Sequence, residues 1–261
     1  MRGITNTVKH LIIINIIFWV GTLAIANGTL FNSLFSFYFP LNDNFKIWQV
    51  FTHMFMHASY IPSGNGQTVF LFHILFNMLG LWMFGSPIEQ ILGKKRFLIL
   101  YFSAGLGATI LPLAIDYYNF YDIIKPLLEQ GLDVNDLVKT LNEGMYSPQW
   151  VEIIGENNWS ELRQIFYGTS LGASGCVMGI LVAFGMLFPN AKLMLIFLPI
   201  PIKAKIFIPL LLGYEIISGL NGGNSMFGFN VGHFAHIGGA LTGFLLMYFW
   251  KKNQFDKYRW N

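Results

Sequence analysis

The sequence predicts an all-α, polytopic membrane protein with six transmembrane helices and an extramembrane insertion between helices 3 and 4. Of its 261 residues, 54% are hydrophobic and only 11% are charged, whereas about a quarter of the residues in soluble proteins are charged. The apolar residues gather in stretches, several of them near the roughly 17 to 25 residues that a bilayer requires of a spanning helix. Basic residues fall unevenly between these stretches, as they do in loops on opposite sides of a membrane.

We expect one membrane domain over residues 1–261, with six spans read from the apolar stretches. The spans are 11–31, 69–84, 97–115, 171–188, 207–220 and 232–250. The second and fifth are short for a full crossing, which indicates tilt, a thinned bilayer or misplaced ends. The first stretch is alternatively a signal peptide, because it follows Arg2 and Lys9 and contains small residues around Ile25. We favour an uncleaved helix, since the later spans need an orienting first helix.

Most of the sixteen Lys and Arg residues lie at the termini and in the even-numbered loops. The positive-inside rule therefore places both termini in the cytoplasm and loops 1, 3 and 5 outside. Loop 3, residues 116–170, holds most of the thirteen acidic residues. Its short apolar patches at 123–128, 137–141 and 150–154 have helical spacing and favour packed helices, with a solvated connector as the alternative.

The remaining composition argues against several partner classes. A single cysteine, Cys176, excludes an intramolecular disulfide framework and is more consistent with an inert packed thiol than with a nucleophile. The net charge of +3 does not indicate a nucleic-acid partner. His53 and His57 have a spacing that zinc sites use, but no acidic or cysteine residue lies near them, so we expect no metal and no cofactor.

Polar groups inside apolar spans are costly, and the few present here are candidates for chemistry. Ser174 stands in the segment Gly172-Ala173-Ser174-Gly175 at the start of the fourth helix. The free amide groups and the positive dipole end of a helix favour an oxyanion there. The alternative is a packing face of small residues that includes a serine.

The sixth span pairs a histidine with glycines. His236 precedes Gly239 by three residues and Gly243 by seven, which puts all three on one helical face. Gly175 and Gly179 form a matching face on the fourth helix, so the two backbones can approach closely. The spacing therefore predicts that the His236 imidazole meets the side chain that precedes Gly175.

These features predict a Ser174–His236 dyad, in which the imidazole takes the hydroxyl proton. No Asp or Glu lies near either residue in these two spans, so a triad is not expected. His73 and Asn77, four residues apart on the second helix, can both donate hydrogen bonds from one face. If that face turns toward Ser174, they and the Ser174 amide can bind the oxyanion of a tetrahedral intermediate.

In this order, the motifs HxxxN, GxSG followed by Gly179, and AHxxGxxxG resemble those of the rhomboid intramembrane serine proteases over nearly the whole chain. Residues 48–57 also look like the family's loop 1, and 85–93 match its GxxxExxxG pattern. The resemblance implies a rhomboid-like bundle that hydrolyses peptide bonds in or near transmembrane segments of protein substrates. It implies a protein of the lipid bilayer, in a bacterial plasma membrane, with a cavity open to the outer side and no metal or cofactor.

The resemblance also implies roles for individual residues. Ser174 is the nucleophile, His236 the general base and acid, and His73, Asn77 and the Ser174 amide the oxyanion-binding groups. The structural residues near the site are Gly172, Gly175, Gly239, Gly243 and Glu89. Glu89 anchors loop 2, with a solvated carboxylate as the alternative.

The chain departs from the family at two positions: Gln49 stands where an arginine is usual, and Met178 where an aromatic residue is common. His233 lines the mouth of the site, while Glu215 bonds within the bundle or marks a second polar site. Two rival classes stay open. A rhomboid-like pseudoprotease that binds membrane proteins would lack the dyad, and a transporter would show paired ionisable groups or repeated broken helices.

Overall fold

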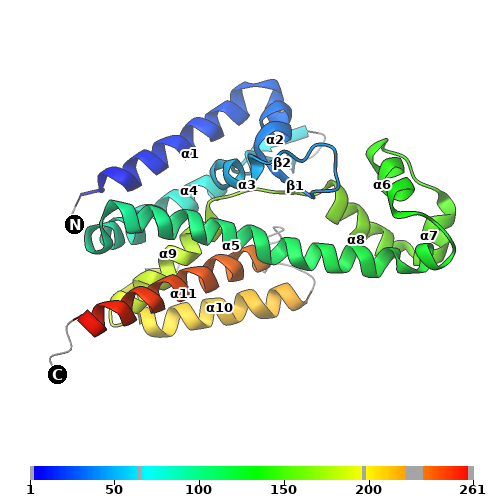
Figure 1. Ribbon diagram of the computed structural model, residues 1–261. Helices are drawn as coiled ribbons and strands as arrows, with labels where there is room; N and C mark the ends of the chain where they lie inside the picture. Colours follow the sequence, from blue (N-terminus) through cyan, green and yellow to red (C-terminus); the bar gives the residue numbers. More distant parts are fainter. Residues whose placement is uncertain (1–2, 64–65, 196–197, 222–231, 258–261) are drawn as a thin grey trace.

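The helices run in a bundle from which a smaller group of helices projects at one end (Figure 1). This computed structural model describes residues 3–63, 66–195, 198–221 and 232–257. The longer bundle helices are α1 (Asn6–Ala24), α4 (Phe72–Gly80), α5 (Ser86–Glu129), α9 (Ser174–Leu187), α10 (Ala204–Leu220) and α11 (His233–Lys257). A π-helical turn, Leu81–Gly85, joins α4 to α5. The expected all-α class is therefore confirmed.

Shorter elements connect these helices. The short helices are η1 (Ala26–Gly28), α2 (Thr29–Phe35), α3 (Gln49–Thr52), η2 (His53–Phe55), α6 (Val134–Asn142), α7 (Pro148–Ile154) and α8 (Glu156–Tyr167). Three antiparallel pairs join β1 (Phe37–Tyr38) to β4 (Thr169–Ser170), β2 (Tyr60–Ser63) to β3 (Gly66–Val69), and β5 (Lys192–Leu195) to β6 (Leu198–Lys203). The β1–β4 pair ties loop 1 to the segment that leads into α9.

A helix lies in each of the six predicted spans, but their ends and lengths differ. Two helical stretches of the described chain are long and apolar enough to cross a membrane, Asn6–Ala24 and Phe72–Glu129. The apolar helix Ser174–Leu187 is shorter. The first span ends earlier than expected, because the chain turns at Ala26 and Asn27, both with a φ of 49°, and re-enters a helix as α2.

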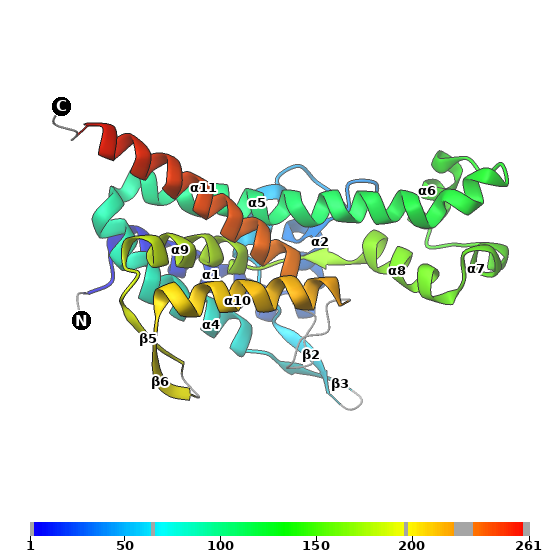
Figure 2. The ribbon, with the colours of Figure 1, turned by 90° about the horizontal axis from the view of Figure 1, so that it is seen from below.

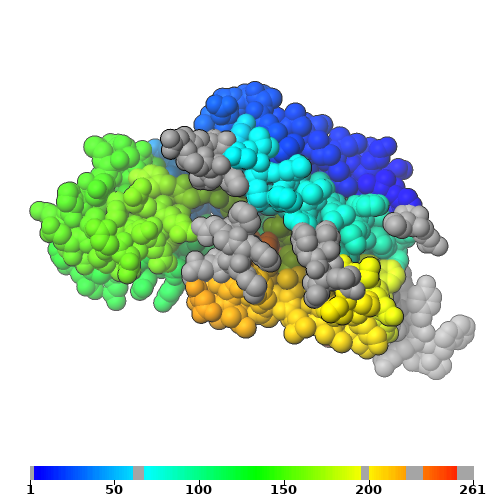
Figure 3. Space-filling view, turned by 180° about the vertical axis from the view of Figure 1, so that it is seen from behind, coloured from blue at the N-terminus to red at the C-terminus, as the bar shows by residue number. Residues whose placement is uncertain are grey.

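The insertion begins as a continuation of α5. This helix is kinked at Gly93, where the backbone is not helical. The part after the kink, residues 94–129, is about 54 Å long, nearly twice the roughly 30 Å of a bilayer core. Helices α6 to α8 pack on its far half around a separate core in which Phe120, Ile124, Leu137, Leu162 and Phe166 are fully buried. The packed helices expected for part of this region are present, and the solvated connector is wrong. Figures 2 and 3 show this insertion projecting from the end of the body.

The main bundle core is built on glycine contacts between α9 and α11. A Cβ atom added to Gly239 would lie 2.7 Å from the carbonyl carbon of Gly175, and one added to Gly243 would lie 2.5 Å from the Gly179 oxygen. Helix α5 joins them, because a Cβ at Gly107 would lie 2.7 Å from a carbonyl oxygen of α11. The predicted close approach of the two glycine faces is confirmed.

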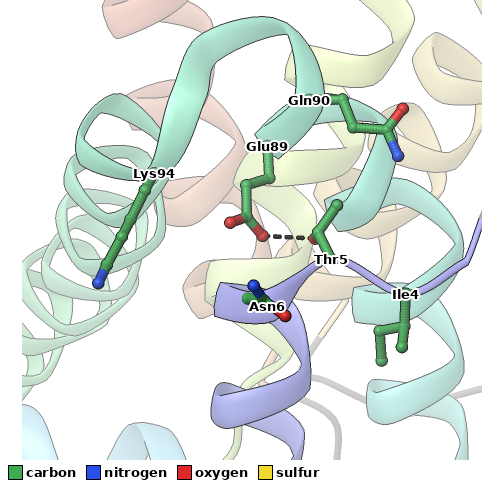
Figure 4. A pocket seen from close by; sticks show the side chains of 6 residues that line it. All are labelled: Ile4, Thr5, Asn6, Glu89, Gln90 and Lys94. Carbon is green, nitrogen blue, oxygen red and sulfur yellow. Dashed lines mark hydrogen bonds between the residues drawn. The ribbon is translucent and has the colours of Figure 1, made fainter.

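The end of the bundle that lies away from α6 to α8 holds the start of α1, the turn between α4 and α5, and the end of α11 (Figure 1). There the Glu89 carboxylate accepts hydrogen bonds from the amides of Thr7 (3.2 Å) and Val8 (3.1 Å) and from the Thr5 hydroxyl. Figure 4 shows Glu89 facing Thr5 in a surface pocket that Lys94 also lines. Glu89 thus caps the positive end of α1 and anchors the loop that follows α4.

Gly243→Ala is expected to destabilise the bundle by about 2 kcal/mol, because the added methyl group enters the backbone of α9. The melting temperature in detergent measures this. Gly213→Ala in α10 is the matched control, since a Cβ atom there meets nothing within 4 Å. Equal melting temperatures for the two variants would contradict the backbone contact at Gly243.

Glu89→Gln is expected to lower stability at pH 7 by about 1 kcal/mol, through loss of the charged cap. Burial acts to raise the pKa of the Glu89 carboxyl from 4.5, but the hydrogen bonds from Thr5, Thr7 and Val8 outweigh burial and lower it. The stabilisation is therefore present above pH 4.5 and is lost as the pH falls through the lowered pKa. Melting curves of wild type and variant should converge in acid, whereas Glu152→Gln, an exposed carboxylate, should change nothing.

Candidate active site

The segment before α9 is fixed by backbone hydrogen bonds. The Gly172 amide donates to the His53 carbonyl at 2.9 Å, and α9 begins at Ser174. Gly172 has a φ of 130°, in the region that favours glycine. A Cβ atom placed on it would lie 3.2 Å from His73 Nε2 and 3.6 Å from Ser174 Oγ. The imidazole of α4 and the hydroxyl of α9 therefore face the same small space.

His73 is held in one orientation and one tautomer. Its Nδ1 accepts a hydrogen bond from the Ala58 amide at 3.0 Å, so in the neutral ring the proton is assigned to Nε2. That N–H faces the space beside Gly172. His73 is thus a neutral hydrogen-bond donor beside the space that Ser174 Oγ also borders.

Asn77 is buried one turn further along α4. Its Nδ2 donates to the His73 carbonyl at 2.8 Å, which uses one of its two N–H groups and leaves the other. The predicted pair therefore lies on one helical face, with His73 pointing to the site and Asn77 tied to its own helix.

Both loop 1 histidines are buried, and one of them, His57, packs against His73. His57 Nε2 lies 2.8 Å from Asn15 Oδ1, and the His57 ring packs edge-on to the His73 ring at 5.2 Å. His53 contacts the Gln49 carbonyl through Nδ1 at 2.7 Å. Within the described ranges no group of three or more His, Cys, Asp or Glu residues could hold a metal ion. Both imidazoles are used in packing this loop.

Gln49 replaces the arginine that the family pattern led us to expect in loop 1. Its side chain is fully buried. The Gln49 amide donates to the carbonyls of Ser33 (3.1 Å) and Asn44 (3.0 Å), and its oxygen accepts from the Lys46 amide (3.1 Å). An uncharged amide therefore anchors loop 1 in this chain.

His236 lies in the first turn of α11, with 13% of its side chain exposed. The Gly175–Gly239 contact brings its helix against α9. No hydrogen bond joins Ser174 to His236 in the described part of the chain. A Cβ atom on Gly175 would lie 3.3 Å from the Ala235 oxygen, so Ser174 and His236 lie at the same end of the glycine contact.

A carboxylate from a third helix accompanies His236. Glu215 of α10 lies between two imidazoles, with Oε1 3.0 Å from His236 Nδ1 and Oε2 2.6 Å from His233 Nδ1. The prediction considered only the two helices that carry Ser174 and His236, so it did not include this contact. The expectation that Glu215 bonds within the bundle is confirmed. The available signal was an isolated acidic residue in an otherwise apolar helix.

Cys176 and Met178 belong to the packed interior. Both side chains are buried in the main hydrophobic core, and a Cβ atom on Gly105 would lie 2.8 Å from Cys176 Sγ. The Cys176 thiol therefore fills space between α5 and α9, as expected for an inert cysteine.

The chain is similar in sequence to several known proteins. The chain is 28% identical over 212 residues to RHOMBOID-like protein 12, mitochondrial, of Arabidopsis thaliana, covering 76% of this chain and 52% of that protein. It is 28% identical over 183 residues to presenilin-associated rhomboid-like protein, mitochondrial, of Bos taurus, covering 66% and 33%. It is 26% identical over 129 residues to rhomboid protein 1, mitochondrial, of Saccharomyces cerevisiae, covering 49% and 25%.

The chain thus matches about half or less of the length of each of these relatives. A family model described as the Rhomboid domain matches residues 44–253, a range that contains His73, Ser174, Glu215 and His236. The chain belongs to the rhomboid family.

Proposed function

We propose that the protein is a serine endopeptidase that hydrolyses peptide bonds in or near the transmembrane segments of membrane-protein substrates. The observation that carries this proposal is the convergence of Ser174 Oγ and His73 Nε2 on the space beside Gly172. A nucleophile and an oxyanion donor must both lie close to the same reacting carbonyl. The glycine contact that brings α11 to α9 adds His236 as the base.

In the proposed reaction, Ser174 Oγ attacks the substrate carbonyl carbon while its proton passes to His236 Nε2. The carbonyl electron pair moves onto oxygen, which His73 Nε2–H and the Ser174 amide stabilise. The intermediate collapses as the C–N bond breaks, and His236 donates its proton to the leaving amine. Water then attacks the acyl-enzyme, giving its proton to His236, which returns it to Ser174 as the acid product leaves.

Location in a bilayer follows from the family, and its finer details are proposals. The basic end of the bundle, with the start of α1 and the end of α11, is proposed to face the cytoplasm or the equivalent inner compartment. The three relatives are mitochondrial by name, which weakens the expected choice of a bacterial plasma membrane. The proposed partners are transmembrane protein substrates within that bilayer.

Ser174→Ala and His236→Ala should each lower cleavage of a fluorescent transmembrane substrate in detergent by about 10⁴-fold or more. A fluorophosphonate should label wild type but not Ser174→Ala. Cys176→Ala is the matched control, because it removes the side-chain sulfur of a buried residue in the same helix. This variant should retain cleavage. Equal cleavage by wild type and both dyad variants would contradict the proposal, and a folded wild type with neither cleavage nor labelling would indicate a pseudoprotease.

His73→Ala should lower kcat by about 100-fold, because removing one oxyanion donor has an effect of this order. Asn77→Ala should have a smaller effect, since its amide is already bonded to the His73 carbonyl. His10→Ala, an exposed histidine near the start of α1, should leave kcat unchanged. A His73→Ala variant with wild-type kcat would remove His73 from the oxyanion site.

A further inference from the structure

We propose that Glu215 is a positioning residue for His236, which holds the imidazole of the Ser174–His236 dyad in the orientation and tautomer that the reaction needs. This inference rests on the proposed protease function. Glu215 comes from α10, which is separate from the helices that carry Ser174, His236 and His73. Its carboxylate is the acidic group nearest to His236 among the ion pairs of the described residues.

The burial of Glu215 calls for an explanation. The residue is only 5% exposed, and it stands in an apolar helix that the family places in a membrane. A buried carboxylate is unfavourable unless it is paired. Each of its oxygens faces one imidazole nitrogen, Oε1 the Nδ1 of His236 and Oε2 the Nδ1 of His233. Two titratable side chains of the described residues, those of His233 and His236, contact the carboxylate.

The position of Glu215 selects the useful tautomer of His236. A carboxylate beside Nδ1 favours the proton on that nitrogen and leaves Nε2 with a free electron pair. Nε2 is the atom that must accept the Ser174 proton. Once it does, the imidazolium carries a positive charge, and the neighbouring Glu215 carboxylate stabilises that charge without taking the proton.

His233 fixes the carboxylate in turn. It is 3% exposed, and its Nδ1 contact at 2.6 Å is shorter than that of His236 at 3.0 Å. The Tyr214 ring packs edge-on against the His233 ring, with centroids 6.0 Å apart. The His236 N–H is not well aligned with Oε1. Such contacts often tighten only when substrate binds.

The test compares Glu215→Gln, Glu215→Asp and the control Ser218→Ala, which changes another buried polar residue of α10. Active sites are counted by fluorophosphonate titration, and kcat, KM and the pH profile are measured with a transmembrane substrate in detergent. For Glu215→Gln we expect kcat to fall by about 100-fold or more, with KM within about twofold. The acid limb of the profile should move to lower pH, because the imidazolium loses its counter-charge. Glu215→Asp should recover part of kcat, and Ser218→Ala should match wild type.

If Glu215→Gln folds and has wild-type kcat per active site and an unchanged pH profile, the proposal is overturned. The same holds if Glu215→Gln lowers the stability of the protein but changes neither of these two readouts. If Glu215→Gln does not fold, kcat per active site and the pH profile of Glu215→Asp test the proposal instead, and wild-type values of both would overturn it. The two hypotheses fail separately. Wild type that does not cleave, or Ser174→Ala that does, overturns the protease function. An active wild type whose Glu215 variants have unchanged kcat and pH profile overturns only the positioning role of Glu215.

Discussion

Backbone atoms of α9 and α11 meet where Gly175 and Gly179 face Gly239 and Gly243. Lipid tails are as apolar as leucine, so helices inside a bilayer associate through close packing and polar contacts and not through hydrophobic burial. Four missing side chains allow that packing. The contact also fixes the rotation of both helices, because any other face would present side chains that hold the backbones apart.

The site is assembled on this contact from separate elements. Helix α9 contributes Ser174 and α11 contributes His236, each just before its glycine face. Loop 1 positions the remaining groups by hydrogen bonds, since the Ala58 amide sets the tautomer of His73 and the His53 carbonyl holds Gly172. Helix α10 adds the Glu215 carboxylate. Rigid support of this kind is what a reaction that depends on oriented donors requires.

Sequence periodicity predicted the parts of this arrangement that lie within one helix. The glycine faces and the His73–Asn77 pair follow from spacings of three and four residues, which the helix geometry fixes. The helix ends did not follow, because long-range contacts decide them. Polar residues after 115 suggested the end of a span, yet α5 continues there because α6 to α8 cover it with a second core.

Sequence periodicity also could not predict the pairing of Glu215 with His236. It depends on the relative rotation of α10 and α11, which a single sequence does not specify. A similar limit applies to Gln49, whose amide replaces the expected arginine through three contacts with backbone atoms distributed between Ser33 and Lys46. Recognising that replacement requires knowing where those carbonyls and amides lie.

The Glu89 cap shows that the matched domain and the folded unit have different boundaries. The family match starts at residue 44, but the Glu89 carboxylate accepts hydrogen bonds from the first amides of α1, which begins at Asn6. Further along the same helix, Asn15 binds His57 beneath His73. A recombinant fragment limited to the matched range would leave the Glu89 carboxylate without its α1 hydrogen-bond donors. It would also leave His57 without its Asn15 partner. Helix α1 is thus a structural part of the site, although it supplies none of the proposed reacting groups.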